Sequence, residues 1–259
     1  MISEIRKLDD KLFSQLVRNH YTRRIKSHYL AYGNSYDFCR FYQVCQNDET
    51  VAVIACFYSS MMVSSVKDKN LSTHTLDEIA DFILLNKPMS VEFEKRWSEH
   101  ITRKTSQSYS SDVRTEFQFI SKKVVPELNV EELPKLSEVF GILKECFPAI
   151  STDENQLWLA DTSHRVRRGL SQSFMLDKCT TATIQYIIDK TVLIGNVGTI
   201  PAERGKHYAR NLLYWIGEKL TDDGFDVRLM ARPHRVSYYE EIGFKEIDTD
   251  IVLERKDND

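Results

Sequence analysis

A strand that runs through a short loop directly into an amphipathic helix constrains this chain more than any other feature. Residues 191–220 read TVLIGNVGTIPAERGKHYARNLLYWIGEKL, and residues 192–197 are mostly apolar and β-branched, which is typical of a buried strand. From about Lys206, apolar residues recur every three or four positions and predict a helix that lies on the sheet: Tyr208, Ala209, Leu212, Leu213, Ile216 and Leu220. The junction therefore predicts an α/β fold.

The loop of this junction, residues 200–205, is suited to an anion. A helix that begins there leaves several backbone N–H groups unpaired and carries the positive end of its dipole. Three basic side chains lie beside it in the sequence, Arg204, Lys206 and Arg210. Phosphate is the anion most often bound at such a junction. The common structural alternative is an ordinary connection with solvated basic residues.

The same residues resemble the acyl-CoA-binding motif of the GNAT superfamily of N-acetyltransferases. In that family a strand ending in V-x-P is followed by x-x-R-G-x-G-x-G/A and a helix. Residues 199–210 read TIPAERGKHYAR. The residues that match are Pro201, Arg204, Gly205, Lys206 and Ala209. His207 replaces a glycine of the motif, and in the right-handed conformation that we expect for it a histidine still offers its N–H.

A second stretch resembles the other signature of the family, F-Y-e-k-l-G-F. Residues 236–244 read VSYYEEIGF and follow the first motif in the family's order. Between the two, residues 226–232 alternate apolar and polar side chains and predict the strand that the family has there. Arg232 stands where the family often has an asparagine. The two signatures together are more specific than either alone.

The resemblance implies a mixed α/β (α+β) fold of the GNAT type, a mixed central sheet flanked by helices. It also implies acetyl transfer from acetyl-CoA to an amine by direct attack. Backbone amides of the central strand would hold the acyl oxygen and the pantetheine, at Val197, Gly198 and Thr199. Amides of the loop would hold the pyrophosphate, at Arg204, Gly205, Lys206, His207, Tyr208 and Ala209.

Proton transfer in this reaction needs an acid and a base. The resemblance implies that Tyr239 protonates the departing thiolate, a transfer that is uphill by roughly 2 kcal/mol from the reference pKa values. A buried packing role is the alternative for Tyr239, and adjacent Tyr238 is expected to be a core residue. Many family members have a glutamate on the central strand, where this chain offers only Asn196. Asp161 and Glu203 lie nearby in the sequence without a defined geometry, so no base is predicted.

Composition argues against several classes of protein. The chain has 259 residues, enough for two ordinary domains, and its net charge of −3 argues against a nucleic-acid partner. Five scattered cysteines without a C-x-x-C pair indicate reduced core residues, and no histidines stand at metal-ligand spacing, so we expect no metal. We identify neither a secretory leader nor a membrane-spanning run, and we expect a cytoplasmic protein without a membrane partner and of unknown oligomeric state.

The first half of the chain predicts a different series of elements. Helical spacing over residues 1–25 rests on Ile5, Leu8, Leu12, Leu16 and Val17. Apolar runs at 41–45 and 51–58 predict a hairpin, and a capping box at 75–78 opens a helix that ends at 86–88. Strands are expected at 91–93 and 117–125, with a helix over 93–101. This order is roughly that of the GNAT fold without its phosphate loop, so the first half is expected to be a degenerate second copy.

The predicted domain boundary lies in the acidic, proline-bracketed segment 126–134. Residues 1–125 form the expected N-terminal lobe and residues 126–259 the acetyltransferase domain, and the polar residues 102–115 are expected to form a loop. The second domain opens with a helix whose apolar stripe is Leu136, Val139, Phe140, Leu143 and Phe147. Strands are then expected at 158–160, 174–176 and 181–188, the last turning at 189–190 into the central strand.

A basic run at residues 164–169, HRVRRG, has two interpretations. It is either a patch for an acidic substrate or for the 3′-phosphate of coenzyme A, or a solvated hairpin loop, which we favour. A nucleic-acid site here has little support, because the run is short and the whole chain is acidic.

Together these features predict a tandem protein with a C-terminal GNAT acetyltransferase lobe and an N-terminal lobe that shapes the acceptor site. The acceptor stays open among a small amine, a peptide N-terminus, a lysine and an antibiotic. The alternative is a non-catalytic acyl-CoA-binding or protein-interaction module, favoured by His207 and by the missing strand glutamate.

Overall fold

The structure is a computed structural model that describes residues 1–5, 10–148 and 152–256. Contacts divide the chain into two compact units, Met1–Arg114 with Thr249–Asp259 as unit 1, and Thr115–Asp248 as unit 2. This division differs from a boundary at residue 125 at two places, because strands β6 (Tyr109–Phe119) and β12 (Phe244–Arg255) each begin in one unit and end in the other.

The first half of the chain contains both strands and helices. They are β1 (Ile2–Glu4), α1 (Asp10–Gln15), α2 (His20–Tyr32), β2 (Cys39–Gln46), β3 (Glu49–Phe57), β4 (Ser60–Ser65), α3 (Thr73–Asn86), β5 (Ser90–Phe93), η1 (Lys95–Trp97), α4 (Ser98–Thr105) and β6.

The elements of the second half follow a similar sequence. They are β7 (Val130–Glu131), α5 (Leu136–Cys146), α6 (Thr152–Arg167), β8 (Gln172–Leu176), β9 (Thr180–Ile188), β10 (Thr191–Thr199), η2 (Pro201–Glu203), α7 (Tyr208–Asp222), β11 (Asp226–Ala231), η3 (Pro233–Arg235), α8 (Val236–Ile242) and β12.

Where the structure describes the chain, each unit contains one parallel pair of strands, and a helix joins the two strands. In unit 1 the sheet order is β1-β2-β3-β4-β5-β12, and only β4 and β5, joined through α3, are parallel. In unit 2 the order is β7-β8-β9-β10-β11-β6, and only β10 and β11, joined through α7, are parallel. The two units therefore repeat one topology, which agrees with a mixed sheet in tandem copies.

The strand beside each parallel pair comes from the other half of the chain. β5 pairs with β12 from Ile251↔Phe93 to Glu254↔Ser90. β11 pairs with β6 from Arg228↔Gln118 to Ala231↔Thr115. Each unit is thus completed by a strand that is distant in sequence, and no local sequence pattern indicates these pairings.

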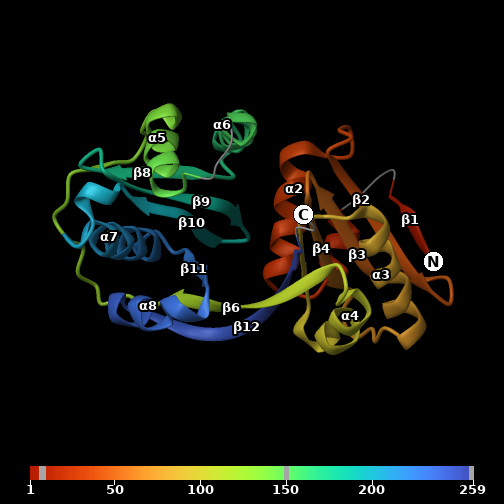
Figure 1. Cartoon of the computed structure of the whole chain (residues 1–259). Coiled ribbons are helices and arrows are strands. Elements are labelled where there is room, and N and C mark those ends of the chain that lie inside the picture. The colour runs from red at the N-terminus through yellow and green to blue at the C-terminus, as the bar shows by residue number, and fades with distance from the viewer. Residues whose placement is uncertain (6–9, 149–151, 257–259) are drawn as a thin grey trace. The chain divides into compact units, whose positions relative to one another are not determined.

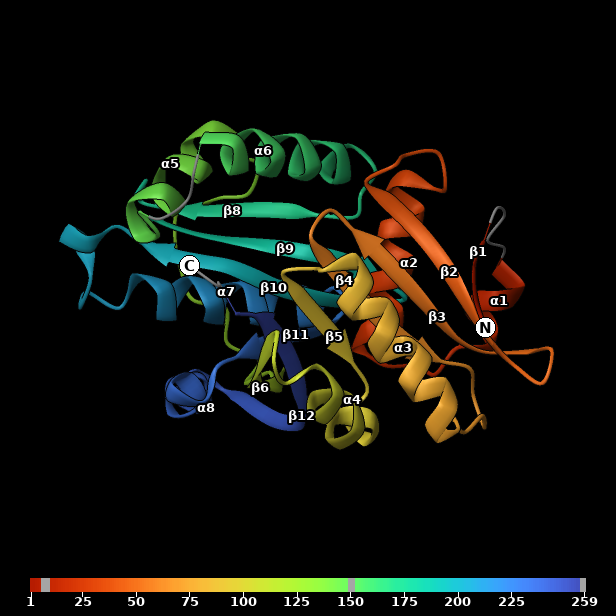
Figure 2. The same cartoon turned by 45° about the vertical axis from the view of Figure 1, so that its right-hand side comes forward.

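The sheet of unit 2 is covered by helices on both faces. Figures 1 and 2 show α5 and α6 on one face and α7 on the other. The apolar stripe of α7 is buried, with Leu212, Leu213 and Ile216 packed on Val192 and Val227 of the central strands. Burial of such side chains contributes about 1.5 to 3 kcal/mol each. This packing holds the strand–loop–helix junction in place.

Two tight turns confirm the predicted hairpins. Asn47 and Asp48 between β2 and β3 have φ of 51° and 62°, and Asp189 and Lys190 between β9 and β10 have φ of 49° and 60°. Two consecutive residues with positive φ make the turn that matches the twist of paired strands, and Asn and Asp tolerate it. The predicted helix of α5 and the strand of β11 are also present.

The prediction of one helix over residues 1–25 is wrong. Residues 2–4 form β1, paired with β2 through Ile2↔Val44, and α1 and α2 are separate helices. Leu8 of the predicted stripe lies outside the described residues. The apolar spacing reflects two short elements in succession, because Phe13 and Leu16 are buried with α1 and Ile25 with α2.

The predicted loop at 102–115 and the predicted strand at 158–160 are also wrong. α4 continues to Thr105 and β6 starts at Tyr109, whose ring is buried. Residues 158–160 belong to α6, where the Trp158 ring lies 5.5 Å from that of Phe140 on α5. The basic run 164–169 lies at the end of α6 and not in a hairpin loop. In these cases tertiary pairing and packing override weak local patterns.

Candidate functional site

Strands β10 and β11 separate beyond their fourth pair. They are paired from Thr191↔Asp226 to Ile194↔Leu229, after which β11 continues only beside β6. The other edge of β10 then carries a bulge, because Gly195 pairs with Thr183 and Gly198 with Thr181. The bulge contains Asn196, at φ 48°. Backbone groups of residues 195–199 are therefore exposed to an opening between the two parallel strands.

The loop after β10 leaves its amides available. A 3-10 turn at η2 and an N–H bond from Arg204 to the carbonyl of Pro201 lead to Gly205, at φ 83°. Within the described residues, the N–H groups of Gly205, Lys206 and His207 donate to no other backbone carbonyl. α7 then starts at Tyr208 without a side-chain capping bond. The loop thus combines free donors with the positive end of a helix dipole.

His207 adopts a left-handed conformation, and the expectation of a right-handed one is wrong. Its φ is 63° and its ψ 12°, in the region where glycine carries no steric penalty. The helix therefore starts two residues later than the apolar spacing suggested, at Tyr208. The glycine pattern of the motif is a conformational requirement here, and histidine meets it at a cost.

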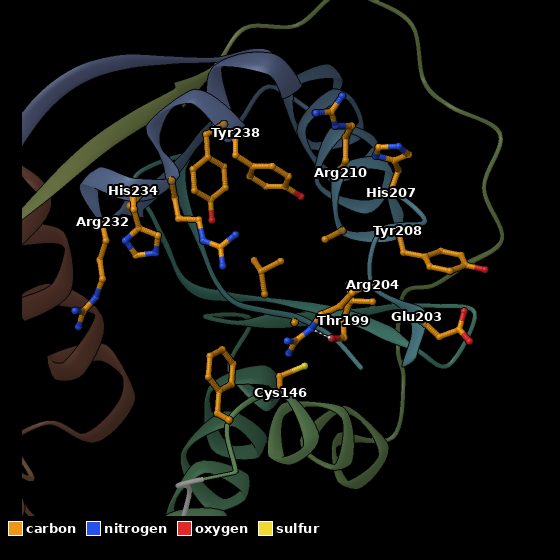
Figure 3. Close-up of a pocket in the computed structure, with 18 of the residues that line it drawn as sticks. Cys146, Thr199, Glu203, Arg204, His207, Tyr208, Arg210, Arg232, His234 and Tyr238 are labelled. Atoms are coloured by element: carbon orange, nitrogen blue, oxygen red, sulfur yellow. Dashed lines mark hydrogen bonds between the residues drawn. The ribbon is translucent and has the colours of Figure 1, made fainter. Parts of the chain in front are cut away.

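Two contacts hold the basic residues of the loop. Arg204 donates from Nε to the carbonyl of Thr199 at 3.2 Å, which Figure 3 marks with a dashed line. Lys206 pairs with Glu203 at 2.7 Å and is exposed. Arg204 thus ties the loop to the end of β10.

A cavity of about 660 Å³ joins the opening and the loop. It lies in unit 2 and is drawn in Figure 3. Its lining comes from the end of α5, the end of β10, the loop, the start of α7, the end of β11, η3 and α8: Cys146, Phe147, Val197, Gly198, Thr199, Glu203, Arg204, Gly205, His207, Tyr208, Ala209, Arg210, Met230, Ala231, Arg232, His234, Arg235, Tyr238 and Tyr239. A volume of this size suits a small molecule.

The structure brings almost all predicted site residues to this one cavity. Every residue predicted to bind the coenzyme lines it except Lys206, whose side chain is held at the surface by Glu203. Tyr239 also lines it, although it lies far downstream in sequence. Asp161 does not line it and pairs with Arg165 on α6 at 2.7 Å.

The two tyrosines of α8 are half-buried and both border the cavity. The Tyr239 ring lies 5.8 Å from that of Phe117 and 6.1 Å from that of Phe244. Burial raises the pKa of Tyr239, and the charge of Arg235 opposes this rise. Burial also raises the pKa of Tyr238, against Arg210 and Arg235. Both phenols therefore stay protonated at neutral pH, as a proton donor must.

Sequence reasoning missed the contribution of α5. Cys146 and Phe147 line the cavity, although the cysteine was interpreted as a core residue. A Cβ on Gly198 would lie 2.8 Å from Cys146 Sγ, so a larger residue at this place on β10 would require Cys146 to move. Burial raises the pKa of the Cys146 thiol and Arg204 opposes it. No sequence signal links α5 to β10, because their contact is set by the fold.

Sequence reasoning also missed the basic side of the cavity. His234 and Arg235 line it from η3, and Tyr238 lines it although it was expected to be core. The one sequence signal for a basic turn was Arg232, which stands where the GNAT family often has an asparagine. Among the described lining residues there are four arginines and one carboxylate, Glu203, a formal excess of three positive charges with neutral histidines (four minus one). The cavity is therefore suited to an anionic ligand.

The corresponding opening of unit 1 is filled by its own side chains. β4 and β5 also pair over four residues, from Ser60↔Ser90 to Val63↔Phe93. Beyond them Glu94 accepts from the N–H of Ser65 at 2.7 Å and from its hydroxyl at 2.6 Å. Arg96 closes the group with a 2.8 Å bond to Glu94. The strand amide that the opening would expose is thus already bonded.

The helix that follows β4 is also self-capped. Ser72 accepts from the N–H of Thr75 at 3.2 Å at the start of α3, so the capping box predicted at Thr75 is wrong by three residues. Ser72 thus occupies an N–H group at the start of α3, whereas the start of α7 has no such side-chain cap. Unit 1 therefore repeats the topology of unit 2 without its anion site.

Neither a metal group nor a membrane span is found in the described parts of the chain. There, no three His, Cys, Asp or Glu side chains gather as metal ligands. Nor is any helix of residues 1–5, 10–148 or 152–256 long and apolar enough to cross a bilayer.

Comparison with known proteins supports the fold. No family model matches the sequence, and no curated protein is similar to it in sequence. A GNAT-family acetyltransferase from Colwellia psychrerythraea matches in structure over 98% of this chain and 99% of its own, with a TM-score of 0.61 and 10% identity. A tandem GNAT protein from the clavulanic acid biosynthesis pathway matches over 100% and 99%, with a TM-score of 0.60 and 10% identity.

A third structure matches over most of the chain. It is a GCN5-related N-acetyltransferase from Sphaerobacter thermophilus, with 83% of this chain and 80% of its own covered, a TM-score of 0.58 and 17% identity. At such identities a structural likeness concerns the fold. Two of the three matches span both units of this chain, which repeat one topology. The chain therefore has the fold of the GNAT acetyltransferases, in tandem.

Proposed function

We propose that the chain is an acetyl-CoA-dependent N-acetyltransferase and that unit 2 carries the reaction. One observation carries the proposal: a single cavity connects the uncapped start of α7 with the open edge of β10. A phosphate-binding end and a strand edge that can hold an amide chain are the two features that an acyl-CoA needs. The acetyltransferases among the structural matches support the same reaction.

The residues at the phosphate end fit the diphosphate of coenzyme A. The N–H groups of residues 205–209 would donate to its oxygens, helped by the dipole of α7. Arg210 pairs with Glu241 through one guanidinium nitrogen, but its Nε is buried and has no hydrogen-bond partner within the described chain. A buried donor without a partner is costly, and an anion at this place would satisfy it.

The open edge of β10 would hold the pantetheine and the acyl group. Backbone N–H and C=O groups of Val197, Gly198 and Thr199 would bond the amides of the pantetheine as a further strand does. The bulge at Asn196 turns the strand locally, so that one amide is free to stabilise the negative charge that develops on the acyl oxygen.

Tyr239 would give its proton to the sulfur as the C–S bond breaks. The amine nitrogen forms the new C–N bond and loses a proton that restores the phenol of Tyr239, and coenzyme A leaves as the thiol. The reference cost of this proton transfer is roughly 2 kcal/mol, and burial adds to it because it raises the pKa of Tyr239. Arg235 works in the opposite direction by stabilising negative charge beside the phenol.

The amine acceptor must be deprotonated before it attacks. Glu203 is the one carboxylate among the described lining residues, and Lys206 pairs with it. Two imidazoles, His207 and His234, also line the cavity. No residue is assigned as the base.

A proline at position 205 tests the phosphate end. Gly205 has φ 83°, which proline cannot adopt, and the change also removes an N–H. At ~100 times its dissociation constant, coenzyme A should stabilise the parent protein by about 2.7 kcal/mol, and the variant should lose this gain. Gly224→Pro is the matched control, because Gly224 is also exposed, has φ 82° and lies away from the cavity.

The control should be at least as destabilised as Gly205→Pro, since the N–H of Gly224 bonds the carbonyl of Thr221. It should nevertheless keep the full stabilisation by coenzyme A. An undiminished stabilisation in Gly205→Pro would refute the assignment of the loop.

Tyr239→Phe tests the proton donor. The ring and its packing are retained, so coenzyme A affinity should be unchanged while turnover falls by about 10² to 10⁴, the usual contribution of a general acid. Tyr238→Phe is the control, since it removes a phenol from the same cavity. Equal turnover in parent and Tyr239→Phe, with chemistry limiting the rate, would leave Tyr239 a packing residue.

The alternative function is acyl-CoA binding without catalysis. His207 in the loop and the absence of a carboxylate from β10 favour it. Incubation with acetyl-CoA and a panel of amines separates the two functions, because a binding module binds coenzyme A but releases no thiol from acetyl-CoA.

A further inference from the structure

The η3 turn presents basic side chains to the cavity at a distance from the phosphate loop. Pro233 opens the turn, and the N–H of Arg235 bonds the carbonyl of Arg232 at 2.9 Å. Arg232, His234 and Arg235 all line the cavity. Figure 3 shows Arg232 and His234 across the cavity from Tyr208 and His207. The cavity thus has two basic sides.

The phosphate loop accounts for only one of these sides. The amides of residues 205–209 and Arg210 suit a diphosphate at the start of α7. η3 instead follows β11, next to the point where β10 and β11 separate, so its side chains border the region where the acyl group and the acceptor would meet. A second basic region is not needed for the transfer of a neutral acetyl group.

Arg235 is close to the phenols that border this region. Its charge opposes the effect of burial on the pKa of both Tyr238 and Tyr239. Its guanidinium is exposed to solvent, so a ligand can reach it. A planar fork of N–H donors of this kind matches the oxygens of a carboxylate or a phosphate.

The positive charge of the η3 turn also disfavours a cationic acceptor. The one lining carboxylate, Glu203, lies on the loop side and pairs with Lys206. No carboxylate among the described lining residues stands beside η3. A polyamine or an aminoglycoside would therefore meet the positive charge of Arg235 on entering this region.

We propose that the η3 turn, through Arg235, binds a carboxylate or phosphate group of the substrate beyond the pantetheine. This inference rests on the proposed acyl-CoA site and deepens it by naming the substrate class. The anionic group is carried either by the amine acceptor, as in an amino acid or a phosphorylated amino sugar, or by the acyl group, as in a dicarboxylic acyl-CoA.

The test measures affinity, because binding requires no turnover. In the protein saturated with coenzyme A, calorimetry compares glycine with glycinamide and glucosamine 6-phosphate with glucosamine. In the free protein, it compares succinyl-CoA with acetyl-CoA. The acidic member of one arm should bind about 2- to 5-fold more tightly, a modest ratio because Arg235 is exposed. The arm that shows the ratio identifies which substrate carries the anion.

Variants assign the preference to the turn. Arg235→Gln should abolish it, and Arg235→Lys should retain part of it because the charge is kept. Arg168→Gln is the matched control, since Arg168 is an exposed arginine of the same unit that does not line the cavity. A cooperative melt of each variant shows that it is folded.

Three results would overturn the inference. In the first, neither arm shows a preference for the acid. In the second, the preference survives in Arg235→Gln. In the third, Arg235→Gln weakens coenzyme A but not 3′-dephospho-CoA, which means that the arginine serves the 3′-phosphate of the coenzyme. Failure of coenzyme A itself to bind would instead refute the proposed function, so the two failures are distinguishable.

Discussion

Replacing His207 by glycine should stabilise the protein, although it deletes a whole side chain. His207 holds φ 63° and ψ 12° at the start of α7, and its side chain makes no capping hydrogen bond. A residue with a Cβ pays about 1 to 2 kcal/mol for this left-handed conformation. Glycine avoids that strain but loses about 0.4 to 1 kcal/mol through the greater freedom of the unfolded chain.

The balance is a gain of about 0.5 to 1 kcal/mol. For a chain of this length, such a gain corresponds to a rise in Tm of about 1 to 4 °C. Coenzyme A affinity should stay the same or improve, because glycine lets a ligand approach the backbone more closely. His207→Ala should show no gain, since alanine retains the Cβ and therefore the strain.

Urea unfolding at 25 °C, with and without coenzyme A, measures these differences. Ala202→Gly is a control for glycine itself, since Ala202 is exposed in η2 and lies outside the left-handed region, so this change should destabilise. If His207→Gly proved no more stable than His207→Ala, the claim that this position favours glycine because of its left-handed conformation would be refuted.

Glu92→Gln should remove an acid-sensitive contribution to stability. Burial raises the pKa of Glu92, but Arg24 and His20 outweigh burial and lower this pKa to about 2. The charged group therefore contributes about 3 kcal/mol to the free energy of unfolding above pH 4.5, and this contribution is lost as the pH falls toward 2. Between pH 5 and pH 2, the urea midpoint should fall more steeply in the parent than in the variant. Calorimetry should count one coenzyme A per chain, because Glu94 fills the opening of unit 1, and a count of two would contradict this closure. The fragment 115–248 should melt cooperatively and bind coenzyme A, whereas 127–259 lacks the part of β6 that pairs with β11 and should not; equal melting of the two fragments would disprove the role of β6.

Much of unit 2 could be predicted because its signals are local. Apolar periodicity located β10, α7 and β11, and the order of two short motifs located the loop and Tyr239. The cavity then gathered almost all of these residues. The prediction failed at α6, because its mostly polar sequence has no clear apolar stripe. Its residue Trp158 packs on Phe140 of α5, a contact that the local sequence does not reveal.

The conformation at His207 shows where a motif stops being informative. The sequence shows that a motif glycine is missing, but a residue type does not report its own φ. The loop needs a positive φ both at Gly205 and at His207 to bring the chain from η2 into α7. The cost of the replacement became visible only with the backbone in place.

By itself the sequence determined the strand–loop–helix junction, the hairpin turns and the candidate residues of the phosphate end, because periodicity and turn preferences act over a few residues. Only the tertiary structure decided which strands complete each unit, with β12 beside β5 and β6 beside β11. It alone placed Cys146 against Gly198, Glu94 across the opening of unit 1 and Arg235 beside the tyrosines of unit 2. These contacts join residues far apart in the chain, and their partners are selected by the packing of the whole sheet, which no local pattern encodes.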